Sequence, residues 1–187
     1  MTRRSTSEIC NEIVALFETG GTENYFGEPV TQLAHALQAA DLASRASADP
    51  ETVLAALFHD IGHLLEGQNG TETGVIDHDL AGRDWLRERG FSERLAALVG
   101  GHVAAKRYLV ATHPHYRQRL SAASIETLRM QGGPMSDAEA RAFEKEPLFA
   151  EMLRLRSWDE QAKDPEAEVP PLGSYREMIV DYLERQP

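Results

Sequence analysis

The chain has 187 residues, with 30 acidic against 19 basic side chains and a formal net charge of -11. This balance disfavours nucleic acid as a general partner, and a single cysteine, Cys10, excludes an internal disulfide. The length suits one domain over residues 1–187. We find no apolar run long enough for a signal peptide or a membrane span, so we expect a cytoplasmic protein with Cys10 buried in its core.

Apolar side chains recur at spacings of three and four along the chain, and alternation of β-branched residues is rare. This pattern predicts an all-α fold. Seven helices are expected, with an eighth segment closing the chain, at 7–19, 31–46, 51–60, 77–89, 92–106, 121–130, 137–158 and 175–185. A polar loop containing glycine is expected at 66–74, and an extended connection at 163–173.

Several helix boundaries have local signals. Asp49 before a proline, Ser92 and Ser136 are typical of helix starts. Gly90 and the segment 132–134, which is Gly-Gly-Pro, are typical of helix stops.

Three histidines lie where predicted helices face a core. His35 follows Leu-Ala and precedes Ala-Leu, His59 follows an apolar run, and His102 follows Leu-Val-Gly-Gly. A lone histidine on an apolar helix face is more often a hydrogen-bonded core residue than a ligand. Burying several imidazole rings requires partners for all of them, and a metal centre supplies such partners.

His59 and Asp60 are adjacent and can offer an imidazole and a carboxylate to one metal ion. With His35 upstream and Asp159 downstream they form the pattern H…HD…D. The pattern resembles the HD-domain superfamily, an all-helical fold of metal-dependent phosphohydrolases with a small branch of di-iron oxygenases. The resemblance implies a helical bundle around a central metal site.

The same resemblance implies a second metal ion. His78 and His102 fall in the interval where two-metal members of the superfamily place additional histidines. Asp60 would then bridge two ions, with His78 and His102 on the second. The first ion would be held by His35, His59 and Asp159.

The remaining histidines have simpler interpretations. His113 and His115 lie in a polar stretch and are expected outside the site. His78 has an alternative as an exposed helix start, because Asp77 and Asp79 suit an exposed first turn.

The segment Tyr25-Phe26-Gly27-Glu28 precedes His35. It resembles the Tyr-x-Gly-Glu loop of the 2-amino-1-hydroxyethylphosphonate dioxygenase family and of the related trimethylammonio-substrate enzymes. This resemblance implies a mixed-valence Fe(II)/Fe(III) pair and O2 as co-substrate. It also implies that Tyr25 occupies the first iron at rest and that Glu28 meets the substrate nitrogen. An ordinary loop turning at Gly27 is the alternative.

Four further residues match that family's phosphonate-binding set, namely His63, Lys106, Ser124 and Arg156. Lys106 follows His102 by four residues and Arg156 precedes Asp159 by three, so helical spacing puts each on the face of a ligand. A phosphonate dianion beside two metal ions needs such cationic and hydrogen-bonding groups. Ser121 competes with Ser124, because serine is common at helix starts.

The resemblance implies cleavage of the carbon-phosphorus bond of a small organophosphonate, with release of phosphate and of glycine or glycine betaine. A primary ammonium can donate hydrogen bonds to Glu28, whereas a trimethylammonium prefers aromatic faces near a negative charge. Such faces could come from Phe26, Tyr108, Tyr116 or Trp158, so both substrates stay open.

Two other functions fit parts of the pattern. A two-metal HD phosphohydrolase could use the same six ligands to activate water against a nucleotide or a small phosphate ester. A degenerate HD domain could act as a sensory or interaction module, although the complete ligand set argues against it.

Overall fold

The computed structural model describes residues 4–25, 27–65 and 77–186. These residues form ten α-helices and two short 3-10 helices. The only extended pairing among them is an isolated bridge between Asn24 and Thr31. The predicted all-α class is therefore confirmed. The predicted loop at 66–74 and the aromatic candidate Phe26 lie outside the described residues.

The helices are named in chain order. They are α1 (Thr6–Gly20), α2 (Gln32–Arg45), α3 (Pro50–Phe58), η1 (Ile61–Leu64), α4 (His78–Glu88), α5 (Glu93–Thr112), α6 (Tyr116–Arg119), α7 (Ala122–Met130), α8 (Asp137–Phe143), α9 (Phe149–Gln161), η2 (Leu172–Tyr175) and α10 (Arg176–Glu184).

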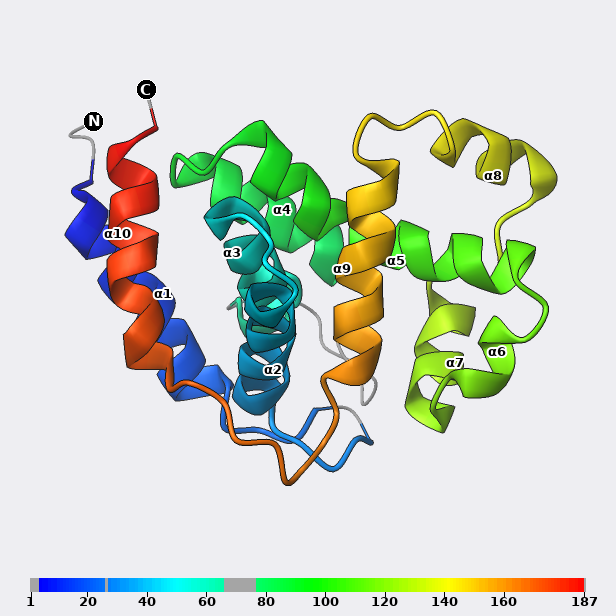
Figure 1. Cartoon of the computed structure of the whole chain (residues 1–187), viewed down its shortest axis with the longest axis horizontal. Coiled ribbons are helices and arrows are strands. Elements are labelled where there is room, and N and C mark those ends of the chain that lie inside the picture. Colours follow the sequence, from blue (N-terminus) through cyan, green and yellow to red (C-terminus); the bar gives the residue numbers. More distant parts are fainter. Residues whose placement is uncertain (1–3, 26, 66–76, 187) are drawn as a thin grey trace.

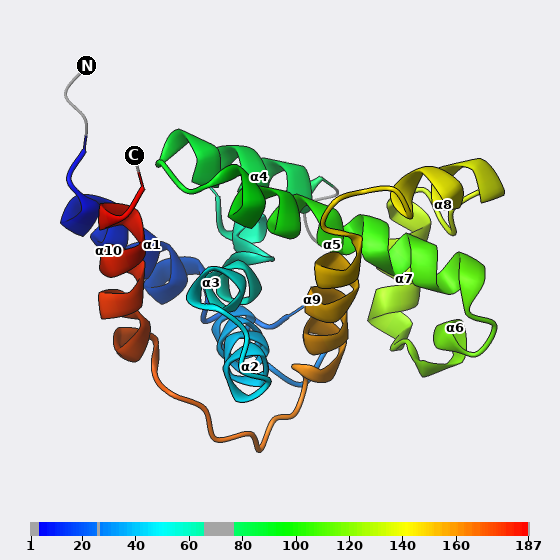
Figure 2. The ribbon, with the colours of Figure 1, turned by 45° about the horizontal axis from the view of Figure 1, so that its top comes forward.

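The middle of the molecule is built from five of these helices. Helix α2 packs against α3 and α9, and α5 packs against α3, α4 and α9. Helices α1 and α10 lie side by side at one end, and α6, α7 and α8 gather around the far half of α5 at the other end (Figures 1 and 2). Helix α5 thus connects the central helices to the α6–α8 end.

The predicted helix starts are confirmed by their hydrogen bonds. Ser92 caps α5 by accepting from the amide of Leu95 at 3.0 Å, and Asp49 caps α3. Ser136 forms a reciprocal capping box with Glu139 at the start of α8. Each such cap satisfies amides that have no partner within the helix.

The predicted single helix at 137–158 is wrong. The chain forms α8, leaves helical conformation after Phe143 and resumes as α9 at Phe149. Pro147 lies in this break. A proline disfavours helical conformation in the residue before it and removes one amide donor.

Other boundaries also differ from the prediction. Helix α5 continues beyond Lys106 to Thr112, and the short helix α6 was not predicted. The helix predicted at 51–60 ends at Phe58, so that His59 and Asp60 lie in the turn between α3 and η1.

The core is formed by apolar faces of the central helices. Leu54 and Phe58 of α3, Leu98 of α5, Leu155 of α9 and Ile179 of α10 are almost completely buried. Each such side chain contributes about 1.5–3 kcal/mol when it is removed from water. Cys10 is buried, as predicted. In the described part of the chain, each helix is too short or too polar to cross a membrane.

Candidate metal centre

Six buried histidine and aspartate side chains converge in the middle of the fold. In each of two groups, the ligand atoms lie within 4.8 Å of one another. One group comprises His35, His59 and Asp159, and the other comprises Asp60, His78 and His102. The structure therefore brings together all six histidine and aspartate residues that the sequence marked as candidate metal ligands, and the seventh candidate, Tyr25, lies against the first group.

The packing of the helices accounts for these two groups. His35 projects from α2, Asp159 from α9 and His59 from the turn after α3, and these three helices pack on one another. The second group draws on α4 and α5, another packed pair, through His78 and His102. His78 begins α4, but its ring is buried, so the alternative of an exposed helix start is not supported.

Backbone carbonyls orient three of the imidazole rings. The Nδ1 atoms of His35, His59 and His102 lie 2.8, 2.8 and 2.7 Å from the carbonyl oxygens of Ala162, Ala56 and Val99. A carbonyl can only accept, so each Nδ1 must carry the proton. In the neutral ring, Nε2 then presents a lone pair, as it does in histidines that bind metal ions.

These lone pairs face each other at a spacing that suits metal ligands. His35 Nε2 lies 3.0 Å from His59 Nε2, and His78 Nε2 lies 3.0 Å from His102 Nε2. Two nitrogens bound to one ion at about 2.1 Å and about a right angle would be about 3.0 Å apart. Two neutral acceptors cannot bond each other, so the pair His35 and His59 must share a cation, either a proton on one ring or a metal ion bound to both.

Asp60 lies between the two groups. Its Oδ1 is 3.2 Å from His78 Nε2 and 3.3 Å from His102 Nε2, and its Oδ2 is 3.6 Å from His35 Nε2 and 3.4 Å from His59 Nε2. Each carboxylate oxygen therefore faces a different histidine pair, which is the arrangement that a bridging ligand requires.

Two buried carboxylate oxygens of the centre have no hydrogen-bond partner among the described residues. They are Oδ2 of Asp60 and Oδ1 of Asp159. Unpartnered buried oxygens are costly and rare in folded proteins. Metal ions would satisfy both, so the side chains fit a dinuclear metal centre.

The charges of the centre also favour cations. Burial disfavours the charged form of His59, but the carboxylates of Asp60 and Asp159 outweigh it and raise the pKa of His59 to about 9. Although burial acts in the opposite direction, the charge of His59 and the surrounding hydrogen bonds hold the pKa of Asp60 well below its usual range. The negative potential that attracts a proton here also attracts metal ions.

Gly62 allows η1 to approach the start of α4. A Cβ on Gly62 would lie 1.9 Å from the carbonyl oxygen of His78. Such an overlap with backbone cannot be relieved by a side-chain rotation. The absence of a side chain at Gly62 therefore keeps His78 within reach of Asp60.

Gly62→Ala should push α4 away and weaken metal binding at His78 and His102. Overpacking of this kind costs about 1–3 kcal/mol, and each kcal/mol lowers Tm by about 2–4 °C in a protein of this size. Thermal unfolding and metal titration check both effects. Gly173→Ala is the control, because a Cβ there meets no atom within 4 Å. Equal Tm and metal content in the two variants would show that η1 can approach α4 without a glycine at position 62.

Tyr25 lies against the first group. Gly27 has a positive φ of 75°, and the turn closes with the Glu28 amide donating to the Tyr25 carbonyl at 2.7 Å. The Tyr25 ring stacks on His35 with ring centroids 4.0 Å apart. Burial, and then the charges of Asp60 and Asp159, hold the pKa of the phenol well above its usual value, and its hydroxyl hydrogen-bonds Asp60.

Arg156 and Lys106 place two basic side chains beside the centre. Arg156 Nη1 pairs with Asp159, its Nε donates to the Tyr116 hydroxyl at 3.0 Å, and its buried Nη2 has no partner among the described residues. Lys106 Nζ donates to Thr127 Oγ1 at 3.1 Å. Burial, and then the charge of Arg156, lower the pKa of Lys106 to about 7.

The other predicted substrate residues, His63 and Ser124, contact different parts of the site. His63 stacks on His78 with ring centroids 3.9 Å apart, and burial, followed by the charge of His78, holds the pKa of His63 well below its usual value. Ser124 is buried and its hydroxyl lies 3.0 Å from Lys163 Nζ. Ser121, the alternative candidate for a substrate-binding serine, caps α7 and also donates a hydrogen bond to Glu28.

The sequence did not indicate Lys163 as a site residue and placed it in an extended connection. No local pattern marks Lys163, because its partners are far away in the sequence.

Two of the proposed aromatic residues have different partners. The Tyr116 hydroxyl accepts from Arg156, whereas the Tyr108 hydroxyl donates to Glu144. His113 and His115 are exposed and outside both groups, as predicted.

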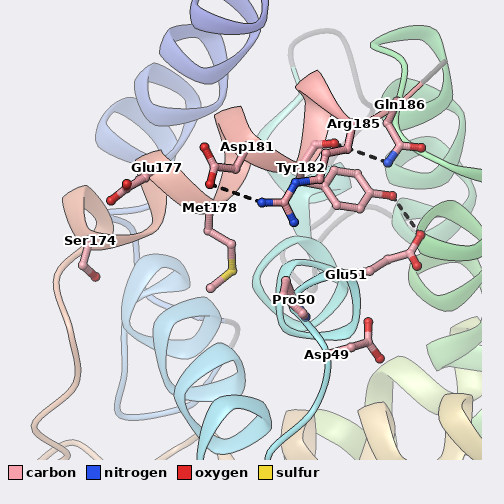
Figure 3. Close-up of a pocket in the computed structure, with 10 residues that line it drawn as sticks. All are labelled: Asp49, Pro50, Glu51, Ser174, Glu177, Met178, Asp181, Tyr182, Arg185 and Gln186. Carbon is pink, nitrogen blue, oxygen red and sulfur yellow. Dashed lines mark hydrogen bonds and ion pairs between the residues drawn. The ribbon is translucent and has the colours of Figure 1, made fainter.

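A separate pocket of about 520 Å³ lies between α10 and the start of α3 (Figure 3). Its lining includes the carboxylates of Asp49, Glu51 and Asp181, and the Tyr182 hydroxyl donates to Glu51 at 2.8 Å. None of its lining residues belongs to the two histidine groups. The pocket is therefore distinct from the metal centre.

Comparison with known proteins gives consistent results. Residues 33–160 match the HD domain family. The chain is 43% identical over 177 residues to an uncharacterized protein of Acanthamoeba polyphaga mimivirus, covering 92% of this chain and 81% of that protein. It is 38% identical over 184 residues to the 1-hydroxy-2-(trimethylamino)ethylphosphonate dioxygenase (glycine-betaine-forming) of Leisingera caerulea, covering 96% and 92%. It is 39% identical over 189 residues to the hydroxymethylphosphonate dioxygenase of Gimesia maris, covering 97% and 91%.

Proposed function

The chain belongs to the HD-domain family and, within it, to the group that contains these phosphonate dioxygenases, and from that premise we propose that it is an iron-dependent oxygenase. It would use O2 to cleave the carbon-phosphorus bond of a 1-hydroxyphosphonate and release phosphate. The observation that carries this proposal is the phenol of the half-buried Tyr25, which stacks on His35 and hydrogen-bonds Asp60 at the two-group centre. Hydrolysis by a two-metal site has no need of such a phenol.

Two iron ions are proposed as the cofactor. The six ligands are imidazoles and carboxylates without thiolate, a set that suits iron, manganese or zinc. The names of the two dioxygenase relatives favour iron among these metals. When bound, a mixed-valence iron pair would supply the activation of O2 and the electron transfer from the substrate.

The phosphonate is proposed to bind between Arg156 and Lys106. The buried Nη2 of Arg156 is available as a donor, and Lys106 is held on α5 one turn beyond His102. A dianion placed here would favour the charged form of Lys106, whose pKa is otherwise lowered to about 7. His63 and Ser124 would complete the hydrogen bonds to the substrate.

The organic part of the substrate is not decided by overall similarity. The two dioxygenase relatives are named for different phosphonates, yet their identities to this chain are 38% and 39%. A substrate with a 2-amino or 2-trimethylammonio group would yield glycine or glycine betaine. The choice must rest on individual residues around Glu28, where the substrate nitrogen was expected.

Tyr25→Phe tests the proposal by spectroscopy. If Tyr25 coordinates the first iron at rest, iron-loaded oxidised protein should show a phenolate-to-iron charge-transfer absorption, and the variant should lack it. Substrate should abolish the band in the wild type, since it displaces the loop. Tyr108→Phe is the control and should keep the band, because its hydroxyl bonds Glu144.

Absence of this band in iron-loaded wild-type protein, or a band that responds to no hydroxyphosphonate, would contradict the proposal that Tyr25 coordinates the first iron at rest. Hydrolysis of phosphate esters at the same centre would then become the better account. The Tyr25→Phe variant should also oxidise faster in air without substrate, because the phenyl ring that remains has no oxygen to occupy the first iron.

A further inference from the structure

Lys163 lies beside the loop that carries Tyr25 and Glu28. Its Nζ is 2.7 Å from Glu28 Oε1 and 3.0 Å from Ser124 Oγ, and it lies 5.9 Å from the centroid of the Tyr25 ring. The side chains of Lys163 and Glu28 are only 14% and 9% exposed. The pair is therefore largely removed from water and close to the residues of the candidate site.

The Glu28 carboxylate has a second donor on the same oxygen. The hydroxyl of Ser121, which caps α7, also donates to Oε1. Glu28 is thus held by α7 on one side and by the segment after α9 on the other. Its charge is balanced within the chain by Lys163.

We propose that Lys163 supplies the positive charge that a substrate ammonium would otherwise bring to Glu28, so that the site prefers a 1-hydroxyphosphonate without a cationic nitrogen. This inference rests on the proposed function and deepens it. Hydroxymethylphosphonate is the simplest substrate of this kind, because its carbon bears only hydrogens beside the hydroxyl and the phosphonate.

An ammonium group has two ways to reach Glu28, and both are unfavourable. It can lie next to Lys163, where two like charges in a poorly solvated site repel each other. It can instead displace Lys163, which leaves a largely buried lysine without its carboxylate. A substrate with an uncharged substituent leaves the pair of Lys163 and Glu28 intact.

The selectivity does not conflict with binding of the phosphonate. Lys106 and Arg156 face the centre from α5 and α9, whereas Lys163 is engaged by Glu28 and Ser124. Lys163 is therefore a specificity-determining residue in this proposal and not a third anion ligand.

Lys163→Gln removes the charge and keeps a hydrogen-bond donor. We would measure dissociation constants of hydroxymethylphosphonate and 2-amino-1-hydroxyethylphosphonate with metal-loaded protein in the absence of O2, and kcat/KM for both in its presence. The wild type should bind hydroxymethylphosphonate more tightly by about tenfold or more. Lys163→Gln should shift this ratio by about tenfold toward the ammonium substrate, while Lys163→Arg keeps the wild-type ratio.

The control is Lys145→Gln, which removes an exposed lysine outside the site and should leave the ratio unchanged. Lys163→Met provides a second uncharged variant if Lys163→Gln fails to fold. Tighter binding of the ammonium substrate by the wild type, or an unchanged ratio in both uncharged variants, would overturn the inference. Failure of the proposed function would show separately, as absence of O2-dependent phosphate release from either compound, because the anaerobic binding ratio does not depend on turnover.

Discussion

Asp60→Ala should reduce the bound metal from about two ions per chain to nearly none and abolish activity. The reason is geometric, since Oδ1 of Asp60 faces His78 and His102 while Oδ2 faces His35 and His59. Without the carboxylate, the second group keeps only two neutral imidazoles, and the first loses the charge that it shares with Asp159. Loss of a ligand or of its supporting partner typically costs at least about 10–100-fold in metal affinity.

The measurement is metal content by elemental analysis after reconstitution, with circular dichroism to check the fold. Asp84→Ala, a surface carboxylate paired with Arg83, is the control and should keep both ions. His102→Ala should lose only the ion of the second group. An Asp60→Ala protein that retains both ions would show that Asp60 does not bridge, and one that retains a single ion would show that His35, His59 and Asp159 hold the first ion without it.

Lys106→Ala should weaken binding of a phosphonate substrate by about 2–4 kcal/mol, which is about a 30- to 1000-fold rise in Kd. Lys106 donates to Thr127 and makes no ion pair with a carboxylate in the described residues, so the metal content should stay near that of the wild type. Arg107→Ala, which removes the next basic residue along α5, is the control. An unchanged Kd in the Lys106 variant would place the phosphonate elsewhere.

Arg156→Ala is expected to have a mixed effect. Its guanidinium pairs with Asp159 and also offers the unpartnered Nη2 to an anion. The substrate affinity should fall as in the Lys106 variant, and the affinity for the first ion should fall as well. This coupling was not foreseen from sequence spacing, which indicated only that Arg156 and Asp159 share a helix face.

The sequence indicated the ligands because the H…HD…D pattern and the two additional histidines resemble the ligand set of the HD-domain superfamily, although these residues are far apart in the chain. Helix starts such as Ser92 and Ser136 were predicted from local signals, since a cap depends on residues three positions apart. Pro147 marks the break between α8 and α9, whereas the apolar spacing on both sides of it predicts one continuous helix.

Lys163 could not be placed from the sequence. Its partners Glu28 and Ser124 are 135 and 39 residues away, and the pairing depends on how α7, α9 and the Tyr25 loop meet. No periodicity encodes such a contact, because the residue follows the end of α9 in a stretch without regular structure. The pair of Lys163 and Glu28, which we propose selects the organic group of the substrate, therefore emerges only from the tertiary fold.

The O2-dependence of phosphate release tests the proposed oxygenase most directly. Iron-loaded protein would be given hydroxymethylphosphonate, its 2-amino-1-hydroxyethyl counterpart and a panel of phosphate esters, while O2 uptake and phosphate are followed together. The account predicts one O2 consumed for each phosphate released from a hydroxyphosphonate, and no phosphate under anaerobic conditions. Phosphate released from an ester at the same rate with and without O2, together with no O2 uptake on any phosphonate, would contradict the oxygenase and identify a hydrolase instead.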